Sequence, residues 1–123
     1  MKYLLDTHVL LWWLSNDHAL THNHKSIILD KRNTCYVSAA TIWEISIKTG
    51  LGKLEIPNDY PEEIRSQGFL ELPVSWIHAQ MVQDLPNHHK DPFDRLLISQ
   101  ALNEEMTLLT VDENIKKYAV SLA

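Results

Sequence analysis

The sequence contains a single cysteine, Cys35, so an internal disulfide is excluded and a reducing cytoplasm suits the protein. No apolar run approaches the roughly 20 residues that a membrane-spanning helix needs. Asp6 and His8 interrupt the apolar stretch at the N-terminus, and we therefore expect no signal peptide. Internal repeats and low-complexity tracts are missing as well. These absences together predict a cytoplasmic protein that does not associate with membranes.

An excess of basic residues is also missing. The chain has 11 lysines and arginines against 16 aspartates and glutamates, which gives a formal net charge of −5. Proteins that bind nucleic acid non-specifically are usually basic, so the net charge argues against that class. The argument loses its force where several acids share one metal site, because bound divalent ions invert the local field. Charge alone therefore leaves the class of binding partner open.

The length and the apolar content of the chain fit one compact domain. With 123 residues, 45% of them hydrophobic, the chain is long enough for one domain and too short for two. A domain of this size buries roughly two-thirds of the surface of its unfolded chain, so it needs no disulfide or metal ion to fold. We expect a single domain over residues 1–123, with Cys35 as a small buried side chain.

Short apolar runs alternate with segments of helical pattern. We expect strands over residues 3–5, 35–37, 69–72 and 107–111, with a candidate edge strand over 120–122. The helical segments are 9–14, 25–31, 38–50, 59–68, 75–84, 91–102 and 112–118. Their expected buried side chains include Ile42, Trp43, Ile45, Ile47, Leu97, Ile98, Ala101 and Leu102. This alternation predicts an α/β fold in which helices cover both faces of a mostly parallel sheet of four to five strands.

Four acidic residues fall close to the ends of the predicted strands. Asp6 ends the first strand, and Glu44 lies in the second turn of the helix that follows the second strand. Asp94 lies in the first turn of its helix, and Asp112 directly follows the fourth strand. Right-handed crossovers bring these helix starts to one edge of the sheet. A divalent cation would offset the repulsion among the carboxylates, and oxygen-rich sites suit Mg²⁺ or Mn²⁺.

Each acid also has a purely structural interpretation. Asp91 is a candidate N-cap with Asp94 as the third helical residue, and Asp112 is a candidate cap as well. Glu44 and Lys48 are four residues apart on a helix, which is the spacing of an exposed ion pair worth about 0.3–0.5 kcal/mol. Only the joint placement of the acids favours a shared site.

Four stretches of the sequence carry a further signal. They are Tyr-Leu-Leu-Asp-Thr-His-Val-Leu-Leu-Trp at 3–12, Val-Ser-Ala-Ala-Thr-Ile-Trp-Glu-Ile-Ser-Ile-Lys at 37–48, His-Lys-Asp-Pro-Phe-Asp-Arg-Leu-Leu-Ile-Ser-Gln-Ala at 89–101 and Leu-Leu-Thr-Val-Asp at 108–112. In content and order they resemble the motifs of PIN-domain ribonucleases, and among these the VapC-like toxins of type II toxin–antitoxin systems. The stretches together span nearly the whole chain.

The resemblance implies a three-layer α/β/α fold and metal-dependent cleavage of RNA. The family's four catalytic, metal-binding acids correspond to Asp6, Glu44, Asp94 and Asp112. It further implies an RNA substrate, a homodimer, and a cognate antitoxin that occupies a groove, with an arginine reaching the acidic site. Two supporting residues also follow from the resemblance, since Thr110 matches a hydroxyl position and Asp91 matches an Asp-Pro-Phe-Asp variant of the third motif.

A mechanism follows as a hypothesis. Asp6, Glu44 and Asp94 would bind one or two Mg²⁺ or Mn²⁺ ions, and Asp112 would be a direct or water-mediated ligand. The metal would orient the scissile phosphate, help to generate hydroxide and stabilise the leaving oxygen. Lys48 and Arg95 are candidate phosphate contacts, and for either of them a solvated surface position is an equal alternative.

Other classes of function remain as alternatives. A haloacid-dehalogenase-like phosphatase also uses an aspartate after its first strand, but it needs a second aspartate two positions on, where this chain has His8. A protein-binding module with structural acids and a metal-dependent DNA nuclease both stay open.

The histidines and tryptophans add two minor hypotheses. His18, His22, His24, His88 and His89 would suit a zinc site, but without partner cysteines a polar surface is the better interpretation. Trp12 and Trp13 are consecutive on a predicted helix and cannot face the same way, so one of them is a candidate interface residue.

Overall fold

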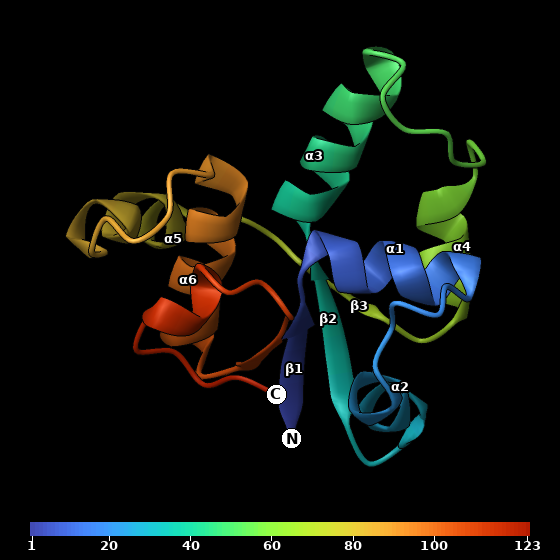
Figure 1. The fold of residues 1–123 in the computed structure, drawn as a ribbon, viewed down its shortest axis with the longest axis horizontal. Coiled ribbons are helices and arrows are strands. Elements are labelled where there is room, and N and C mark those ends of the chain that lie inside the picture. The colour runs from blue at the N-terminus through green and yellow to red at the C-terminus, as the bar shows by residue number, and fades with distance from the viewer.

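The computed structural model describes residues 1–123 and contains one four-stranded sheet with helices on both faces (Figure 1). In chain order the elements are β1 (Lys2–Leu5), α1 (Thr7–Ser15), α2 (His22–Leu29), β2 (Thr34–Ser38), α3 (Ala39–Gly50), α4 (Tyr60–Ser66), β3 (Leu70–Leu72), α5 (Trp76–Met81), the 3₁₀ turn η1 (Val82–Asp84), α6 (Pro92–Glu104), β4 (Thr107–Leu109) and the 3₁₀ turn η2 (Ile115–Lys117). None of the helices combines the length and the apolar character required to cross a lipid bilayer.

The sheet is parallel throughout, and its strands lie in the order β3-β2-β1-β4. From β1 the chain steps outward to β2 and β3, and it then crosses the sheet to add β4 on the other side of β1. The strand order therefore reverses at β1. In open α/β sheets, ligands bind outside the carboxyl ends of the strands at such a switch point. Asp6 directly follows β1, so the topology alone puts its carboxylate there.

Strand β1 is buried on both faces of the sheet. Alternate side chains point to opposite faces of a strand, and Tyr3 and Leu5 pack in one core cluster with side chains of α1, α3 and α4. Leu4 packs in a second cluster on the other face, mainly with side chains of α6. A parallel strand covered in this way has a continuous apolar run, which is what residues 3–5 have. The expected three-layer α/β/α fold is confirmed, with four strands.

Side-chain caps fix where three helices begin. The Asp6 carboxylate accepts the backbone N–H of Val9 at 2.8 Å and starts α1, and the Ser38 hydroxyl accepts that of Ala40 at 3.0 Å and starts α3. The Asp91 carboxylate caps α6. Figure 1 shows α1 and the start of α3 at the same end of β1 and β2. The helices that carry the predicted acids therefore begin along one edge of the sheet.

Several segments differ from the sequence-based expectation. The strand expected over 107–111 ends at Leu109, so Asp112 lies three residues beyond β4 rather than directly after it. The helix expected over 75–84 is divided into α5 and η1. The helix expected over 25–31 is α2, which begins earlier because the Thr21 hydroxyl caps it by accepting the backbone N–H of His24 at 3.1 Å. The strand expected over 120–122 is reduced to a single bridge between Leu108 and Leu122. The helix expected over 112–118 is the short turn η2.

Three side chains expected in the core lie at the surface instead. Trp43 is 59% exposed, Leu102 is 39% exposed and Ile47 is 38% exposed. Helix α3 buries Ile45 completely and Glu44 almost completely, so its inward stripe includes an acid and excludes two large apolar residues. The apolar residues of α3 are therefore spread over a wider part of the helix surface than the face that packs against the core.

Candidate metal centre

A polar pocket of about 320 Å³ lies at the carboxyl end of β1. Its lining residues are Asp6, Thr7, His8, Trp12, Glu44, Lys48, His89, Asp91, Asp94, Val111 and Asp112. The four predicted acids thus line the same pocket, together with the two predicted supporting residues Asp91 and Lys48. Thr110 contacts Asp6 from the end of β4, whereas Arg95 does not line the pocket.

Asp6 is held at the floor of the pocket by hydrogen bonds to both of its carboxylate oxygens. Its Oδ1 accepts the backbone N–H of Val9, and its Oδ2 accepts the Thr110 hydroxyl in a short hydrogen bond. Only 5% of the residue is exposed, and this burial raises the pKa of Asp6 although both hydrogen bonds act in the opposite direction. Asp6 therefore has a fixed orientation, with lone pairs left for a further ligand.

Glu44 is buried beside Asp6 and has two partners of its own. Its Oε1 accepts the Thr7 hydroxyl at 2.7 Å, and its Oε2 accepts from the Lys48 ammonium group at 2.7 Å. The pair of Glu44 and Lys48 that the sequence predicts on α3 is present, but Glu44 is 5% exposed rather than lying on a solvated face. Lys48 is accordingly the one lysine that lines the pocket.

The third group of side chains is His89, Asp94 and Asp112. The Nε2 atom of His89 lies 2.8 Å from Oδ2 of Asp94 and 3.9 Å from Oδ2 of Asp112. One potential ligand atom of each residue lies within 4.8 Å of the other two, a spacing that could accommodate one metal ion. Burial raises the pKa of Asp94 to about 6, and the charge of Asp91 acts in the same direction.

Asp91 has both a structural and an electrostatic effect. Its Oδ1 accepts the backbone N–H groups of Phe93 at 2.9 Å and of Asp94 at 3.1 Å, so it is the N-cap of α6. Its carboxylate also faces the pocket and disfavours the ionised form of Asp94. Asp112 likewise combines two contacts, because its Oδ1 accepts the backbone N–H of Asn114 at 2.7 Å while its Oδ2 faces His89.

Arg95 has a different setting from the one expected of a phosphate contact. Its guanidinium donates to the carbonyl of Pro86 at 2.8 Å, to that of Val82 at 3.1 Å and to the Tyr118 hydroxyl at 3.0 Å. Val82 belongs to η1, Pro86 to the loop before α6 and Tyr118 to the C-terminal segment, so Arg95 holds these segments against α6. Its donors are directed at protein carbonyls and a tyrosine rather than at the pocket.

The donor set of the pocket fits a hard divalent cation. One lysine, Lys48, lines the pocket. Five carboxylates line it as well: Asp6, Glu44, Asp91, Asp94 and Asp112. Carboxylate oxygens are the ligands that Mg²⁺ and Mn²⁺ prefer, and a bound cation would neutralise charge that the protein leaves uncompensated. The pKa of Asp94 is raised mainly by burial, and the neighbouring charge of Asp91 adds to the effect. The histidines suggested as a zinc cluster do not gather here, apart from His89.

Sequence reasoning missed His89 and Thr7 as members of this site. Thr7 directly follows Asp6, and His89 stands two residues before Asp91, so both lie inside stretches that carry the family resemblance. The loop before α6 has no periodic pattern, and no sequence feature other than its place in the motif distinguishes His89 from the neighbouring His88. Trp12, predicted as an alternative to Trp13 for an interface, lines the pocket.

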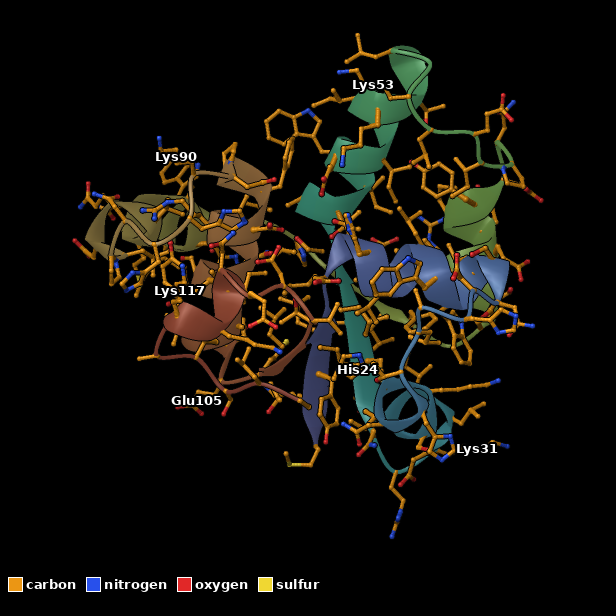
Figure 2. The ribbon with its side chains drawn as sticks, in the orientation of Figure 1. His24, Lys31, Lys53, Lys90, Glu105 and Lys117 are labelled. Atoms are coloured by element: carbon orange, nitrogen blue, oxygen red, sulfur yellow. The ribbon has the colours of Figure 1, made fainter.

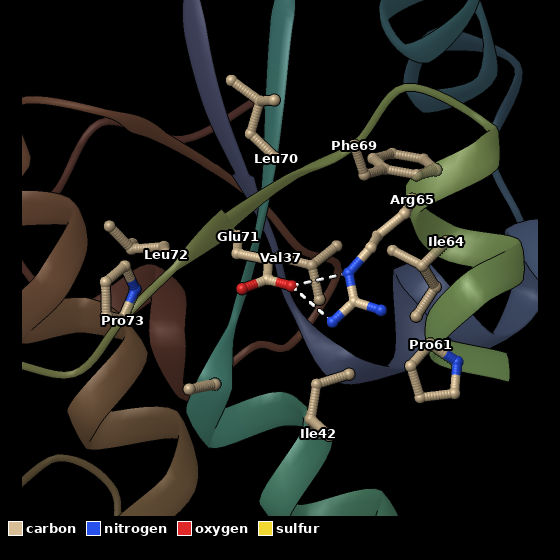
Figure 3. Close-up of a pocket in the computed structure, with 11 residues that line it drawn as sticks. Val37, Ile42, Pro61, Ile64, Arg65, Phe69, Leu70, Glu71, Leu72 and Pro73 are labelled. Atoms are coloured by element: carbon tan, nitrogen blue, oxygen red, sulfur yellow. Dashed lines mark hydrogen bonds and ion pairs between the residues drawn. The ribbon is translucent and has the colours of Figure 1, made fainter.

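A second pocket, of about 280 Å³, lies between α3, α4 and β3 and is largely apolar (Figure 3). Ile42, Ile64 and Phe69 are among its lining residues, and Arg65 forms an ion pair with Glu71 at 2.7 Å beside them. Strand β3 is an edge of the sheet. This pocket shares no lining residue with the acidic one.

Comparisons with solved structures agree on the fold. A chain in the crystal structure of VapBC2 from Rickettsia felis bound to a DNA fragment from its promoter covers 100% of this chain and 98% of its own length, with 19% identity and a TM-score of 0.75. A chain of a toxin–antitoxin complex from Klebsiella pneumoniae covers 89% of this chain and 86% of its own length, with 15% identity and a TM-score of 0.59. The PIN domain endonuclease Utp24 covers 94% of this chain and 74% of its own length, with 16% identity and a TM-score of 0.56.

Sequence comparison identifies the family independently of these structures. No curated protein sequence matches the chain significantly. The PIN domain family, however, matches residues 3–121, which include all four strands except the first residue of β1. The chain therefore belongs to the PIN domain family.

Proposed function

We propose that this protein is a metal-dependent endoribonuclease, the toxin of a toxin–antitoxin pair, and that it cleaves RNA phosphodiesters at the acidic pocket. The observation that carries the proposal is the gathering of Asp6, Glu44, Asp94 and Asp112 around one pocket at the switch point of the sheet. A pocket with five carboxylates and one lysine needs a cation, and a divalent ion is the simplest one.

The acids would share the metal ligation among them. Asp6, Glu44 and Asp94 would hold one or two Mg²⁺ or Mn²⁺ ions, and Asp112 would act directly or through a water molecule. When bound, such ions orient a phosphodiester, help to generate hydroxide at neutral pH and stabilise the leaving oxygen. No nucleophilic side chain is required for this chemistry.

The neighbouring side chains would keep the ligands in place. Thr110 fixes one oxygen of Asp6 by donating a hydrogen bond to it. The Thr7 hydroxyl donates to Oε1 of Glu44, and the Lys48 ammonium group donates to Oε2. Partners of this kind orient ligands and strengthen metal binding in many metalloproteins. Once Glu44 coordinates a metal ion, the Lys48 ammonium group would also be able to contact a phosphate oxygen of the substrate.

The family and the solved relatives support the proposal. PIN domains are nucleases that use divalent metals, and Utp24 is described as a PIN domain endonuclease. The Klebsiella pneumoniae relative belongs to a toxin–antitoxin complex. We extend these properties to this chain, with RNA in the cytoplasm as the substrate and residues 1–123 as a single nuclease domain.

A cognate antitoxin and a second copy of the chain are the proposed protein partners. The apolar pocket between α3, α4 and β3 is the candidate site for an antitoxin segment, because apolar side chains surround it and Leu70 on the edge strand is 49% exposed. Leu70→Glu is expected to weaken the complex with the antitoxin while RNA cleavage persists. An unaltered complex would contradict this docking site, and a monomer in sedimentation at micromolar concentration would contradict the dimer.

The nuclease proposal is tested by cleavage of a structured RNA with Mg²⁺, with Mn²⁺ and with EDTA. Asp6→Asn keeps the size of the side chain and removes the charge, so it is expected to abolish cleavage and leave the fold intact. Full activity of this variant would overturn the assignment. Cleavage of a DNA of the same sequence would instead support the DNA nuclease alternative. A folded wild-type protein that cleaves neither the RNA nor the DNA would favour a protein-binding module.

A further inference from the structure

The carboxylate of Asp94 is held in the pocket by a single hydrogen bond. The carboxylates of Asp6 and Glu44 accept hydrogen bonds at both of their oxygens. The carboxylate of Asp94 accepts one, from the ring of His89, whose Nε2 lies 2.8 Å from Oδ2. Its Oδ1 has no donor and is free to bind a further ligand. The orientation of this carboxylate in the pocket therefore depends on His89.

The second ring nitrogen of His89 decides which atom carries the proton. Nδ1 lies 3.1 Å from the backbone nitrogen of Lys90, whose N–H group can only donate. Nδ1 must therefore be the acceptor, and in a neutral imidazole the proton then lies on Nε2, which donates to Asp94. A metal-binding Nε2 would need the reverse arrangement, with a proton on Nδ1. That proton would point at the N–H group of Lys90.

The main chain fixes His89 as firmly as its ring. The backbone N–H of His89 donates to the hydroxyl of Tyr118 at 2.9 Å, and its carbonyl accepts from the Arg95 guanidinium at 3.4 Å. Tyr118 is itself 5% exposed. The next residue, Lys90, is exposed and lies towards the edge of the molecule in Figure 2, whereas His89 lines the pocket. All four hydrogen-bonding groups of His89 are thus engaged, and the loop before α6 presents its ring to Asp94.

We propose that His89 is a positioning residue of the metal centre, and that its Nε2–H group orients the Asp94 carboxylate so that Oδ1 stays free to bind a divalent cation. This inference rests on the proposed function and adds a residue that acts through Asp94 rather than on the cation. The spacing of His89, Asp94 and Asp112 alone would also allow a ring nitrogen as a ligand. The contact with Lys90 favours the donor.

The test is calorimetric titration of the metal-stripped protein with Mn²⁺. His89→Ala removes the donor and is expected to lower the Mn²⁺ affinity roughly 10- to 100-fold, the effect of losing an orienting partner. His88→Ala is the matched control, because His88 is an exposed neighbour that packs against Tyr118 and lines neither pocket. Circular dichroism in EDTA checks that each variant is folded.

Two amide variants separate the two ring nitrogens. In His89→Gln the amide nitrogen reaches the position of Nε2, so this variant can still donate to Asp94 and should keep most of the Mn²⁺ affinity. In His89→Asn the amide reaches only the position of Nδ1, and this variant should bind Mn²⁺ as weakly as His89→Ala does. If His89→Ala fails to fold, the comparison of these two variants decides by itself.

Titration with Ni²⁺ distinguishes a hydrogen-bond donor from a metal ligand. Imidazole nitrogen suits Ni²⁺, whereas Mn²⁺ prefers carboxylate oxygen. If His89 is a donor, His89→Gln should keep most of the affinity for both ions, and His89→Ala should lower both by a similar factor. A large loss of Ni²⁺ affinity in His89→Gln, with Mn²⁺ affinity retained, would make His89 a ligand and overturn the proposal.

Two further results would overturn the role of His89. One is an equal Mn²⁺ affinity of His89→Ala and His88→Ala, and the other is a His89→Gln variant that binds as weakly as His89→Ala. Neither affects the nuclease proposal if the wild type binds Mn²⁺ and cleaves RNA. The expected affinities in a wild type that cleaves no nucleic acid would retain the positioning role and remove the nuclease. A wild type that binds no Mn²⁺ would overturn both.

Discussion

At the scale of single residues, the site is defined by charge that the protein itself does not neutralise. The pKa of Asp94 is raised to about 6 from an ordinary value of 3.8, first by burial and then by Asp91. The folded protein therefore binds the Asp94 proton more tightly than the unfolded chain does. Its free energy of unfolding falls as the pH rises from about 4 to 6, and the loss is complete above that range.

Asp94→Asn should consequently stabilise the metal-free protein. A difference of about two pKa units corresponds to at most roughly 3 kcal/mol at pH 7, and the gain should vanish near pH 4. Urea unfolding in EDTA across this pH range measures it, with the exposed Glu62→Gln as the control. Added Mg²⁺ should stabilise the wild type more than it stabilises Asp94→Asn. A variant that is less stable than the wild type at pH 7 would contradict the uncompensated charge.

Thr110→Val should weaken metal binding without disturbing the core. The substitution removes the hydroxyl that donates to Asp6 and keeps a side chain of similar shape at a position that is 4% exposed. Loss of such an orienting partner typically lowers metal affinity roughly 10- to 100-fold. Calorimetric titration with Mn²⁺ measures the change, and Thr110→Ser should restore the affinity. Equal affinities for the valine and serine variants would show that the hydroxyl has no role.

At the scale of elements, helix starts decide where the acids lie. Asp6 caps α1, Ser38 caps α3 and Asp91 caps α6, and each helix then carries or follows an acid of the pocket. The acids were expected along one edge because right-handed crossovers bring the helix starts there, and they do line one pocket. The exposed face of α3 was not recognisable. Trp43 and Ile47 have the spacing of core residues, and only the tertiary arrangement leaves them outside.

The two effects of Asp91 can be separated on α6. Asp91→Ala removes both the cap and the charge and should cost about 0.5–2 kcal/mol of stability. Asp91→Ser keeps a capping oxygen and removes the charge, so it should retain nearly wild-type stability while the pKa of Asp94 moves towards its ordinary value. Thermal unfolding compares the variants. Equal loss of stability in both would mean that the charge of Asp91 rather than its hydrogen bonds starts the helix.

At the scale of the whole molecule, the parallel sheet explains how residues separated by more than a hundred positions meet. Thr110 reaches Asp6 because β4 pairs directly with β1. Alternating apolar runs and helical segments were sufficient to predict this α/β arrangement. The setting of Arg95 could not be predicted from the sequence, because most of its acceptors are backbone carbonyls of η1 and of the loop before α6, and every residue type has such a carbonyl.

The net charge of −5 has a measurable consequence for RNA binding. For single strands the logarithm of affinity falls with the logarithm of salt concentration with a slope of about −0.7 per phosphate contact. Because Lys48 is the one lysine that lines the pocket, the slope should be about −0.7. Anisotropy titrations of Asp6→Asn at several salt concentrations measure it. A slope of about −4 or steeper would contradict this expectation, because it would require several further phosphate contacts outside the pocket.

On the proposed function, the acids at the switch point bind a divalent metal and cleave RNA with it. The most direct measurement is the rate of cleavage of one single-stranded RNA as free Mg²⁺ is removed by EDTA and then restored in the same sample. We expect cleavage to stop in EDTA, to resume with a saturable dependence on Mg²⁺, and to be missing throughout for Asp6→Asn. Cleavage that continues in excess EDTA, or that Asp6→Asn performs at the wild-type rate, would contradict it.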